Sequence, residues 1–400
     1  MHFFTAVLAS LALLASPVFS APTAPPLVSV NKFAGPKNNG SYIVKLKDNV
    51  TKSNHLNWLS NQIGEDAITH KNWNAEVLHG FAGKFSDKVI DLLRASPDVE
   101  YIEEDGIMSI NAQVTQTNAP WGIARLSQDG KLASQSTSSL TFTYRYDSAA
   151  GSGVDIYVVD TGVFTSHSQF GGRARWGGTF GNYADADGNG HGTHVAGTAA
   201  GSQFGVAKAA NIIAIKVLSD QGSGTVSDIV SGLDFVLSSA RSSGRPSIAT
   251  MSLGGSASTA LDNAVASLTA GGVHVTVAAG NDNVDARNTS PARAPSANTV
   301  GATTIADAKA SFSNFGAIVD LFAPGQNVIS SWIGSTTATN NISGTSMATP
   351  HVAGLIAYII SRTGNASPAT ISNTLKDLAV KGAITGLSTG TANNLARNDQ

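Results

Sequence analysis

Strand-like and helix-like runs alternate along the chain from about residue 112 onward, and this alternation limits the possible folds more than any other feature. The apolar, strand-like runs lie at 154–159, 211–218, 247–253 and 273–279. Helical patterns near 226–243 and 259–270 lie between them, and an almost wholly apolar helix is expected near 347–361. Because strands joined through helices pair in parallel, the sequence predicts an α/β domain with a mostly parallel sheet covered on both faces.

The N-terminal part of the chain is organised differently. An apolar stretch over 3–15, too short to span a bilayer, predicts a signal peptide at 1–20 that directs the protein to the extracellular space; a membrane anchor is the alternative interpretation. After a Pro-rich linker, a unit over about 40–108 has the order strand, helix, strand, strand, helix, strand. This order predicts a small ferredoxin-like α+β domain.

Composition narrows the classes of partner. Only 13% of the residues are charged and 42% are hydrophobic, so the chain is expected to fold into a globular protein, and we expect a monomer. The net charge of −2 gives no reason to expect a nucleic-acid partner or an anionic membrane. The chain has no cysteine, so its stability must come from packing, and from any bound metal, instead of disulfides.

An acid, an imidazole and a hydroxyl occur in three segments beside these predicted elements. Asp160 follows the strand at 154–159 in VVDTG, His191 lies between two glycines in NGHGTHVAGT, and Ser346 opens a helix in SGTSMATPHVAG. Taken singly, each has an ordinary interpretation: a turn acid, a metal ligand together with His194, and a helix N-cap. Together they occur in the chain order Asp, His, Ser that is typical of one class of serine hydrolase.

This set predicts nucleophilic catalysis at Ser346. A serine hydroxyl needs a base such as His191 to take its proton, and the histidine needs an acid such as Asp160 to hold its tautomer. Asn281, in VAAGN, offers an amide that can bind an oxyanion together with the backbone N–H of Ser346. A turn residue after Gly280 is the alternative interpretation of Asn281.

The segments VVDTG, GHGTHVAGT, VAAGN and GTSMATPHVAG resemble the signature segments of the subtilases, and the chain from Pro120 onward is similar to the proteinase K branch, common among secreted fungal proteases. The resemblance covers about 112–395 and implies a subtilisin-like three-layer sandwich with a mostly parallel seven-stranded sheet. It implies a serine endopeptidase that acts on proteins and peptides without a catalytic cofactor. Some relatives attack keratin, which is a further possible substrate. Val195 stands where proteinase K has a cysteine, so thiol reagents are not expected to inhibit.

Residues 40–110 are similar to the subtilase propeptide, an inhibitor that also helps the catalytic domain to fold. We therefore expect an autoprocessed zymogen with a propeptide at 21–111 and a catalytic domain at 112–400. The bond expected to be cut lies near Asn111–Ala112. A domain built from long-range parallel pairing folds slowly, which gives a physical reason for such a piece.

The resemblance also implies two substrate-binding edge segments and a small apolar wall. Their glycines would let a substrate backbone approach closely, although glycines that serve turns alone are the alternative. The implied residues are Gly222, Ser223, Gly224, Ser252, Leu253, Gly254, Ala278, Ala279 and Gly280. Because no charged residue stands at the matched wall positions, we expect broad cleavage with a preference for apolar or aromatic P1 residues.

Two segments invite a calcium interpretation. The first, over 185–196, begins like an EF-hand loop with Asp185, Asp187 and Asn189, but Ala196 at its twelfth position has no carboxylate, so we reject it. The second matches the strong calcium site of proteinase K-type enzymes, and a structural Ca²⁺ is expected there. Its implied ligands are the carbonyls of Pro295 and Ala297 and the carboxylate of Asp320. Candidate glycosylation sites are Asn288, Asn341 and Asn365.

Other functions agree less well with the sequence. A dinucleotide-binding enzyme would carry GxGxxG after its first strand, but Gly151 and Gly153 precede that strand. An α/β-hydrolase would carry GxSxG, whereas Ser346 lies in GTSMA. A catalytically inactive binding protein on the same fold would have no need to keep all four catalytic positions filled.

Overall fold

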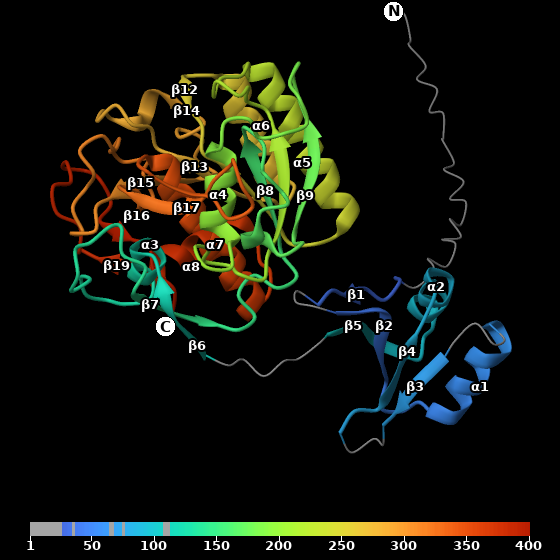
Figure 1. Cartoon of the computed structure of the whole chain (residues 1–400). Coiled ribbons are helices and arrows are strands. Elements are labelled where there is room, and N and C mark those ends of the chain that lie inside the picture. Colours follow the sequence, from blue (N-terminus) through green and yellow to red (C-terminus); the bar gives the residue numbers. More distant parts are fainter. Residues whose placement is uncertain (1–25, 34–36, 64–67, 74–76, 107–112) are drawn as a thin grey trace, which may run out of the picture. The chain divides into compact units, whose positions relative to one another are not determined.

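The computed structural model describes residues 26–33, 37–63, 68–73, 77–106 and 113–400 (Figure 1). The predicted signal peptide and processing bond lie outside these residues. The chain divides into two compact units, the first mostly between Asn39 and Asp105 and the second mostly from Gly106 to Gln400. Within the described ranges, no helix combines the length and the apolar character needed to cross a membrane.

The first unit is a five-stranded sheet, in the order β1–β5–β2–β4–β3, with two helices. Its elements are β1 (Val30–Asn31), β2 (Lys37–Leu46), α1 (Lys52–Ile63), β3 (Ile68–Asn72), β4 (Gly80–Lys84), α2 (Asp87–Ala95) and β5 (Val99–Gly106). Helix α2 buries one face, with Val89, Ile90 and Leu93, against the sheet. The predicted strand–helix–strand–strand–helix–strand order is confirmed, and the short strand β1 is added at one edge.

The second unit is built on a sheet in the order β19–β20–β16–β15–β13–β11–β8–β10–β9. Its strands are β8 (Asp155–Asp160), β9 (Ala174–Thr179), β10 (Asn211–Lys216), β11 (Ser247–Met251), β13 (His274–Ala278), β15 (Asn298–Thr303), β16 (Leu321–Pro324), β19 (Val380–Lys381) and β20 (Asn394–Leu395). The pairs from β9 to β20 are parallel, and β19 pairs antiparallel with β20. The seven longer strands confirm the predicted parallel sheet, which two-residue strands extend at one edge.

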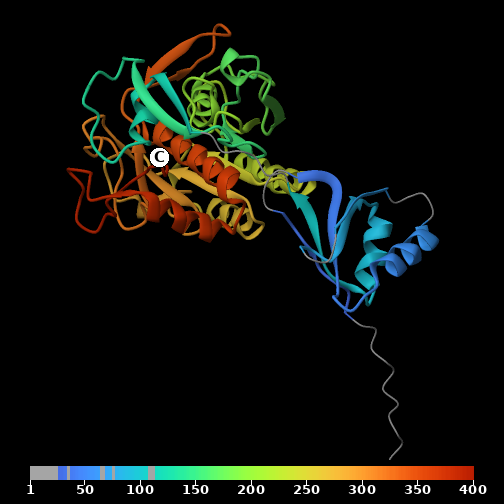
Figure 2. The same ribbon diagram turned by 90° about the horizontal axis from the view of Figure 1, so that it is seen from below.

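Helices cover both faces of this sheet (Figures 1 and 2). They are α3 (Trp121–Arg125), α4 (His191–Ala200), α5 (Val226–Ser243), α6 (Thr259–Ala270), α7 (Thr345–Thr363) and α8 (Pro368–Leu378). Alternation along β8 separates two cores: Ile156 and Val158 join the cluster that contains α4 and α7, whereas Tyr157 and Val159 join the cluster that contains α5 and α6. The three predicted layers are therefore confirmed.

Small two-stranded sheets complete the second unit. Their strands are β6 (Gln113–Ala119), β7 (Phe142–Asp147), β12 (Gly255–Ser256), β14 (Thr289–Ser290), β17 (Val328–Ser331) and β18 (Thr339–Ile342). Short 3₁₀ turns occur at Ser168–Phe170 and Ala286–Asn288.

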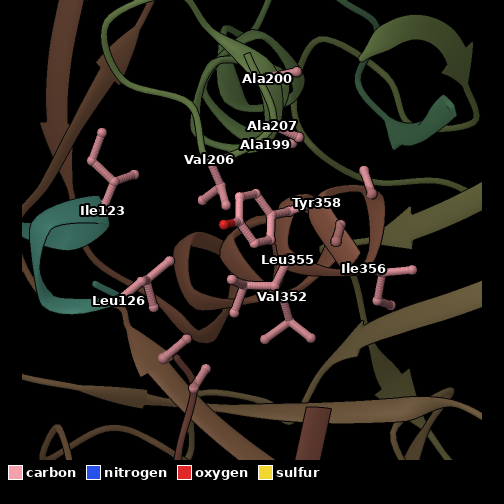
Figure 3. Close-up of a cluster of buried hydrophobic side chains, with 14 of the residues drawn as sticks. Ile123, Leu126, Ala199, Ala200, Val206, Ala207, Val352, Leu355, Ile356 and Tyr358 are labelled. Atoms are coloured by element: carbon pink, nitrogen blue, oxygen red, sulfur yellow. The ribbon is translucent and has the colours of Figure 1, made fainter. Parts of the chain in front are cut away.

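Helix α7 is buried, as its almost continuous apolar sequence predicts. Figure 3 shows its side chains Val352, Leu355 and Tyr358 in the core near Val206. Gly354 permits close packing, since a Cβ there would meet Val206 Cβ at 2.6 Å and the Ala199 carbonyl oxygen at 2.8 Å. Helix α7 packs against α4 on one side and against strands β13 and β15 on the other, and this close packing fixes the position of the helix that carries Ser346.

Candidate active site

The predicted catalytic residues come from the ends of neighbouring elements. Asp160 is the last residue of β8, His191 is the first of α4, and Ser346 is the second of α7. Asn281 follows β13, which ends at Ala278. Because β8, β11 and β13 are parallel neighbours, the loops after their carboxyl ends meet at one edge of the sheet.

The acid and the imidazole are in direct contact. The Nδ1–H of His191 donates to Asp160 Oδ1 at 2.7 Å, and the Thr161 N–H donates to the same oxygen at 2.8 Å. Asp160 is fully buried, and among the residues that the structure describes no group donates to its Oδ2. A carboxylate can only accept, so this contact places the ring proton on Nδ1 and leaves Nε2 able to take a proton from another group.

The charges around His191 change its acidity. Burial lowers the pKa of the ring, but the charge of Asp160, the hydrogen bond to Asp160 and the charge of Asp187 raise it. The net result is a pKa above the ordinary histidine value. An imidazole with a raised pKa is a stronger base once it is neutral.

The Ser346 hydroxyl is held by the neighbouring strand end. It donates to the Ser252 carbonyl at 3.2 Å, and Ser252 Oγ donates back to the Ser346 carbonyl at 2.8 Å. That carbonyl is available because Pro350, four residues on in α7, has no N–H to donate. Within the described ranges the hydroxyl thus bonds Ser252 rather than His191, and such catalytic bonds often form only when substrate binds.

Asn281 is oriented by Thr345, a residue that sequence analysis missed. The N–H and the hydroxyl of Thr345 both donate to Asn281 Oδ1, at 2.8 and 3.0 Å, and the hydroxyl accepts from the Gly280 N–H at 3.2 Å. Because Oδ1 is engaged in this way, the Nδ2 amide group points away from Thr345 and can donate elsewhere. The sequence signal for this role was the position of a threonine directly before the serine in GTSMA. The structure shows that this threonine is buried.

Comparison with known proteins decides the family. The sequence profile described as "Subtilase family" matches residues 151–396. The chain belongs to the subtilase family. A second profile, "Peptidase inhibitor I9", matches residues 41–111 of the same chain. This subtilase is therefore a serine endopeptidase that carries a propeptide domain of the I9 type.

Several curated relatives resemble the subtilase over most of its length. A cuticle-degrading protease of Metarhizium anisopliae is 44% identical over 89% of each chain. Proteinase R of Parengyodontium album is 47% identical over 90% of this chain and 88% of its own. Among solved structures, a cold-adapted subtilisin-like serine proteinase is 45% identical, with a TM-score of 0.63, over 70% of this chain and 98% of the other.

The substrate-binding residues predicted for the subtilase differ in exposure. The exposed ones are Gly222, Ser223, Gly224 and Gly254. The buried ones are Ser252, Ala278 and Ala279, and the intermediate ones are Leu253 and Gly280. Hydrogen bonds link these residues to the catalytic loops. Ser252 and Gly280 bond the start of α7. Near the exposed segment 222–224, Asn189 Nδ2 donates to the Asp220 carbonyl at 2.8 Å.

The second histidine of the GHGTH segment has a different environment from His191. Its ring nitrogen Nε2 lies 2.9 Å from the Val328 carbonyl oxygen, and the side chain is completely buried. Burial lowers the pKa of His194 to about 3, so the ring is neutral at ordinary pH. His194 therefore donates to the backbone of β17 and ties α4 to that hairpin.

The expected calcium ligands have the right chemistry but a competing cation. One carboxylate and two carbonyls are oxygen donors of the kind that calcium binds. In the subtilase, Asp320 Oδ1 pairs with Lys376 Nζ at 2.8 Å, and Asp320 Oδ2 accepts from the Thr299 N–H at 2.9 Å. The donors fit, and an ion bound there through Pro295, Ala297 and Asp320 would have to displace the ammonium of Lys376.

The candidate glycosylation sites also differ in exposure. Asn288 and Asn341 are exposed, and Asn365 is partly buried. The side-chain carbonyl of Asn365 accepts from His274 Nε2 at 2.9 Å, which leaves its amide nitrogen available. Glycan attachment at any of the three stays a prediction.

Proposed function

We propose that the subtilase is a secreted endopeptidase whose nucleophile is Ser346, whose general base is His191 and whose orienting acid is Asp160. The observation that carries the proposal is the 2.7 Å contact between His191 and Asp160 at the end of β8. It is supported by the bond from Ser346, at the N-terminus of α7, to the carbonyl of Ser252, which follows the neighbouring strand β11. The two bonds from Thr345 to Asn281 Oδ1 orient the Asn281 amide, which supports a role for its Nδ2 as oxyanion donor.

The chemistry follows from these positions. Ser346 Oγ attacks the peptide carbonyl carbon while its proton passes to His191 Nε2, and Asp160 stabilises the imidazolium. The carbonyl oxygen becomes an oxyanion that accepts from Asn281 Nδ2 and the Ser346 N–H, beside the positive end of α7. The oxyanion then re-forms the carbonyl as the C–N bond breaks, and His191 gives its proton to the leaving amine. A water molecule, deprotonated by His191, attacks the acyl-enzyme in the same way and releases the carboxylic acid and the Ser346 hydroxyl.

Hydrolysis of a chromogenic peptide tests this assignment. The mature enzyme should cleave the peptide, and a serine-directed reagent should block cleavage by reacting at Ser346. Ser346→Ala should abolish both the cleavage and the covalent labelling. Covalent label found on any other serine, or full activity in Ser346→Ala, would contradict the assignment.

The proposed specificity is broad, with a preference for apolar or aromatic P1 residues. The small side chains of Ala278 and Ala279 support it, since they leave no charge to pair with a basic or acidic P1 group. A peptide-library cleavage profile tests this point, and best cleavage after Lys or Arg would contradict it. Keratin is a finer proposal that rests on family resemblance alone, and release of soluble peptide from keratin tests it.

The proposed maturation removes a signal peptide at 1–20 and a propeptide at 21–111 and leaves a catalytic domain at 112–400. The match of the I9 profile to residues 41–111 supports this division. We propose that the enzyme cuts its own chain near Asn111–Ala112 after the propeptide has served as inhibitor and folding aid. N-terminal sequencing of the secreted enzyme should start near 112, and a start upstream of 105 would contradict the proposal.

A further inference from the structure

The loop before His191 contains a buried carboxylate that the mechanism above does not use. Asp187 is 8% exposed and accepts five hydrogen bonds. Its Oδ1 accepts from Thr161 Oγ1 at 2.9 Å and from the N–H groups of Asn189 and Gly190 at 3.1 and 2.9 Å. Its Oδ2 accepts from the Thr193 N–H at 3.0 Å and from Thr193 Oγ1 at 2.6 Å.

These donors lie on both sides of the catalytic pair. Thr161 follows Asp160 directly, and its hydroxyl also accepts from the Gly192 N–H at 3.0 Å. Gly190 and Gly192 flank His191, while Thr193 lies in the first turn of α4. The single carboxylate of Asp187 therefore fixes the loop after β8 and the start of α4 relative to each other.

Asp187 also completes the N-terminus of α4. The N-cap residue of this helix is Gly190, which has no side chain to accept from the free N–H groups. Asp187 accepts from two of these groups, the N–H of Gly190 and the N–H of Thr193. It therefore caps the helix from a position three residues before Gly190. Because α4 begins at His191, this cap sets the place of the imidazole.

The charge of Asp187 acts on His191 as well. The acidic groups that act on the ring are Asp160 and Asp187, and both raise its pKa against the lowering effect of burial. His194, one turn along α4, is neutral because its pKa is about 3. From β10, Lys216 donates to the Thr161 carbonyl at 2.6 Å and to Asp220 at 2.9 Å, so its charge is paired.

We propose that Asp187 is a positioning residue for the general base: it holds His191 against Asp160 and its charge stabilises the imidazolium that forms during catalysis. The proposal rests on the proposed function of His191 and adds a second acid that touches neither substrate nor the reacting atoms. A misplaced base costs rate even when every reacting group is present.

Asp187→Asn tests the proposal, with Asp185→Asn as the matched control. Asp185 lies two residues away, is exposed and accepts from Thr179 Oγ1. In Asp187→Asn, kcat should fall about 10- to 100-fold with little change in KM, and the acidic limb of the kcat/KM–pH profile should move to lower pH. Asp185→Asn should keep the parent kcat and pH profile.

A second pair covers the case in which Asp187→Asn does not fold. Thr161→Val removes the hydroxyl that bonds Asp187 and Gly192, and Thr161→Ser keeps it. Thr161→Val should have a lower kcat than the parent enzyme, and Thr161→Ser should have a kcat close to that of the parent. Equal kcat in the two Thr161 variants, or an unshifted profile with parent kcat in Asp187→Asn, would overturn the proposal.

His191→Ala separates this result from a failure of the proposed function. If His191 is the base, this variant loses activity whatever the outcome at Asp187. Full activity in His191→Ala would refute the role of His191 itself, whereas an inactive His191→Ala beside an unaffected Asp187→Asn would refute only the role of Asp187.

Discussion

At the residue scale, His191 is influenced by two carboxylates of different reach. Asp160 bonds the ring directly, and Asp187 acts through its charge and through the backbone on both sides of the ring. Both raise the pKa of His191. A neutral imidazole is needed to accept the Ser346 proton, so activity must fall as the pH drops through this raised value.

The acidic limb of kcat/KM should therefore have an apparent pKa above the ordinary histidine value of about 6.5. The same shift means that protonated His191 stabilises the folded enzyme below about pH 6.5, and that this contribution disappears as the pH rises through the folded-state pKa. Hydrolysis of an uncharged peptide across the pH range measures the limb. A limb below the ordinary value would show that burial, which lowers the pKa, outweighs both carboxylates.

Thr345 gives a second prediction at this scale. Thr345→Val removes the hydroxyl that bonds Asn281 Oδ1, so the Asn281 amide is less well fixed and binds the oxyanion less well. We expect kcat to fall about tenfold with KM nearly unchanged, because the interaction matters mainly in the transition state. Steady-state kinetics measures both constants.

Thr349→Val is the control for this change. Thr349 lies one turn further along α7, and its hydroxyl donates only within the helix, to the Thr345 carbonyl at 2.8 Å. It should keep the parent kcat. An equal loss of kcat in the two variants would assign the effect to the helix rather than to the oxyanion donor.

At the scale of elements, periodicity predicted two capped helices of the second unit but missed α8, although Ser367 caps it through its side chain. The patterns at 226–243 and 259–270 became α5 and α6, which Thr225 and Ser258 cap through their side chains. The strands β1, β19 and β20 were not predicted, because two residues are too few to show a period. In the site, the motifs located the loops, but the bond from Ser346 to Ser252 depends on tertiary contact that no local pattern encodes.

Lys376 on α8 shows how tertiary contact changes an expected site. Lys376→Met frees Asp320 Oδ1, so calcium should raise the melting temperature more in this variant than in the parent. At a calcium concentration 100 times Kd, binding should raise the free energy of unfolding of this variant by about 3 kcal/mol. Thermal unfolding with calcium and with a chelator measures it.

Lys131→Met is the control, because Lys131 is an exposed lysine elsewhere in the second unit. Its response to calcium should equal that of the parent. The same calcium response in Lys376→Met and Lys131→Met would show that no ion competes with Lys376 for Asp320.

At the scale of the whole molecule, the second unit depends on pairing between distant parts of the chain. Strand β8 lies between β10 and β11, and β20, close to the C-terminus, pairs with β16. A fold of this kind must close long loops before its core forms, so it folds slowly.

Residues 112–400 produced alone should therefore refold slowly after denaturation, and a separately produced 21–111 fragment should raise the yield of active enzyme several-fold. Recovered peptidase activity, measured after removal of the fragment, gives the yield. An unrelated small protein at the same concentration is the control, and equal yields with and without the fragment would contradict a folding role for the propeptide.

The paired bonds between Ser346 and Ser252 also say something about the enzyme at rest. A hydroxyl hydrogen that points at a carbonyl cannot point at an imidazole at the same time, so the O–H bond of Ser346 must turn away from Ser252 before His191 can take the proton. Pro350 makes the second bond of this pair possible, because it has no N–H to donate to the Ser346 carbonyl and so leaves that oxygen to accept from Ser252 Oγ. A substrate peptide that donates an N–H to the Ser252 carbonyl would displace the Ser346 hydroxyl from that oxygen. Substrate binding would then make the nucleophile available to its base, so binding and activation would be coupled.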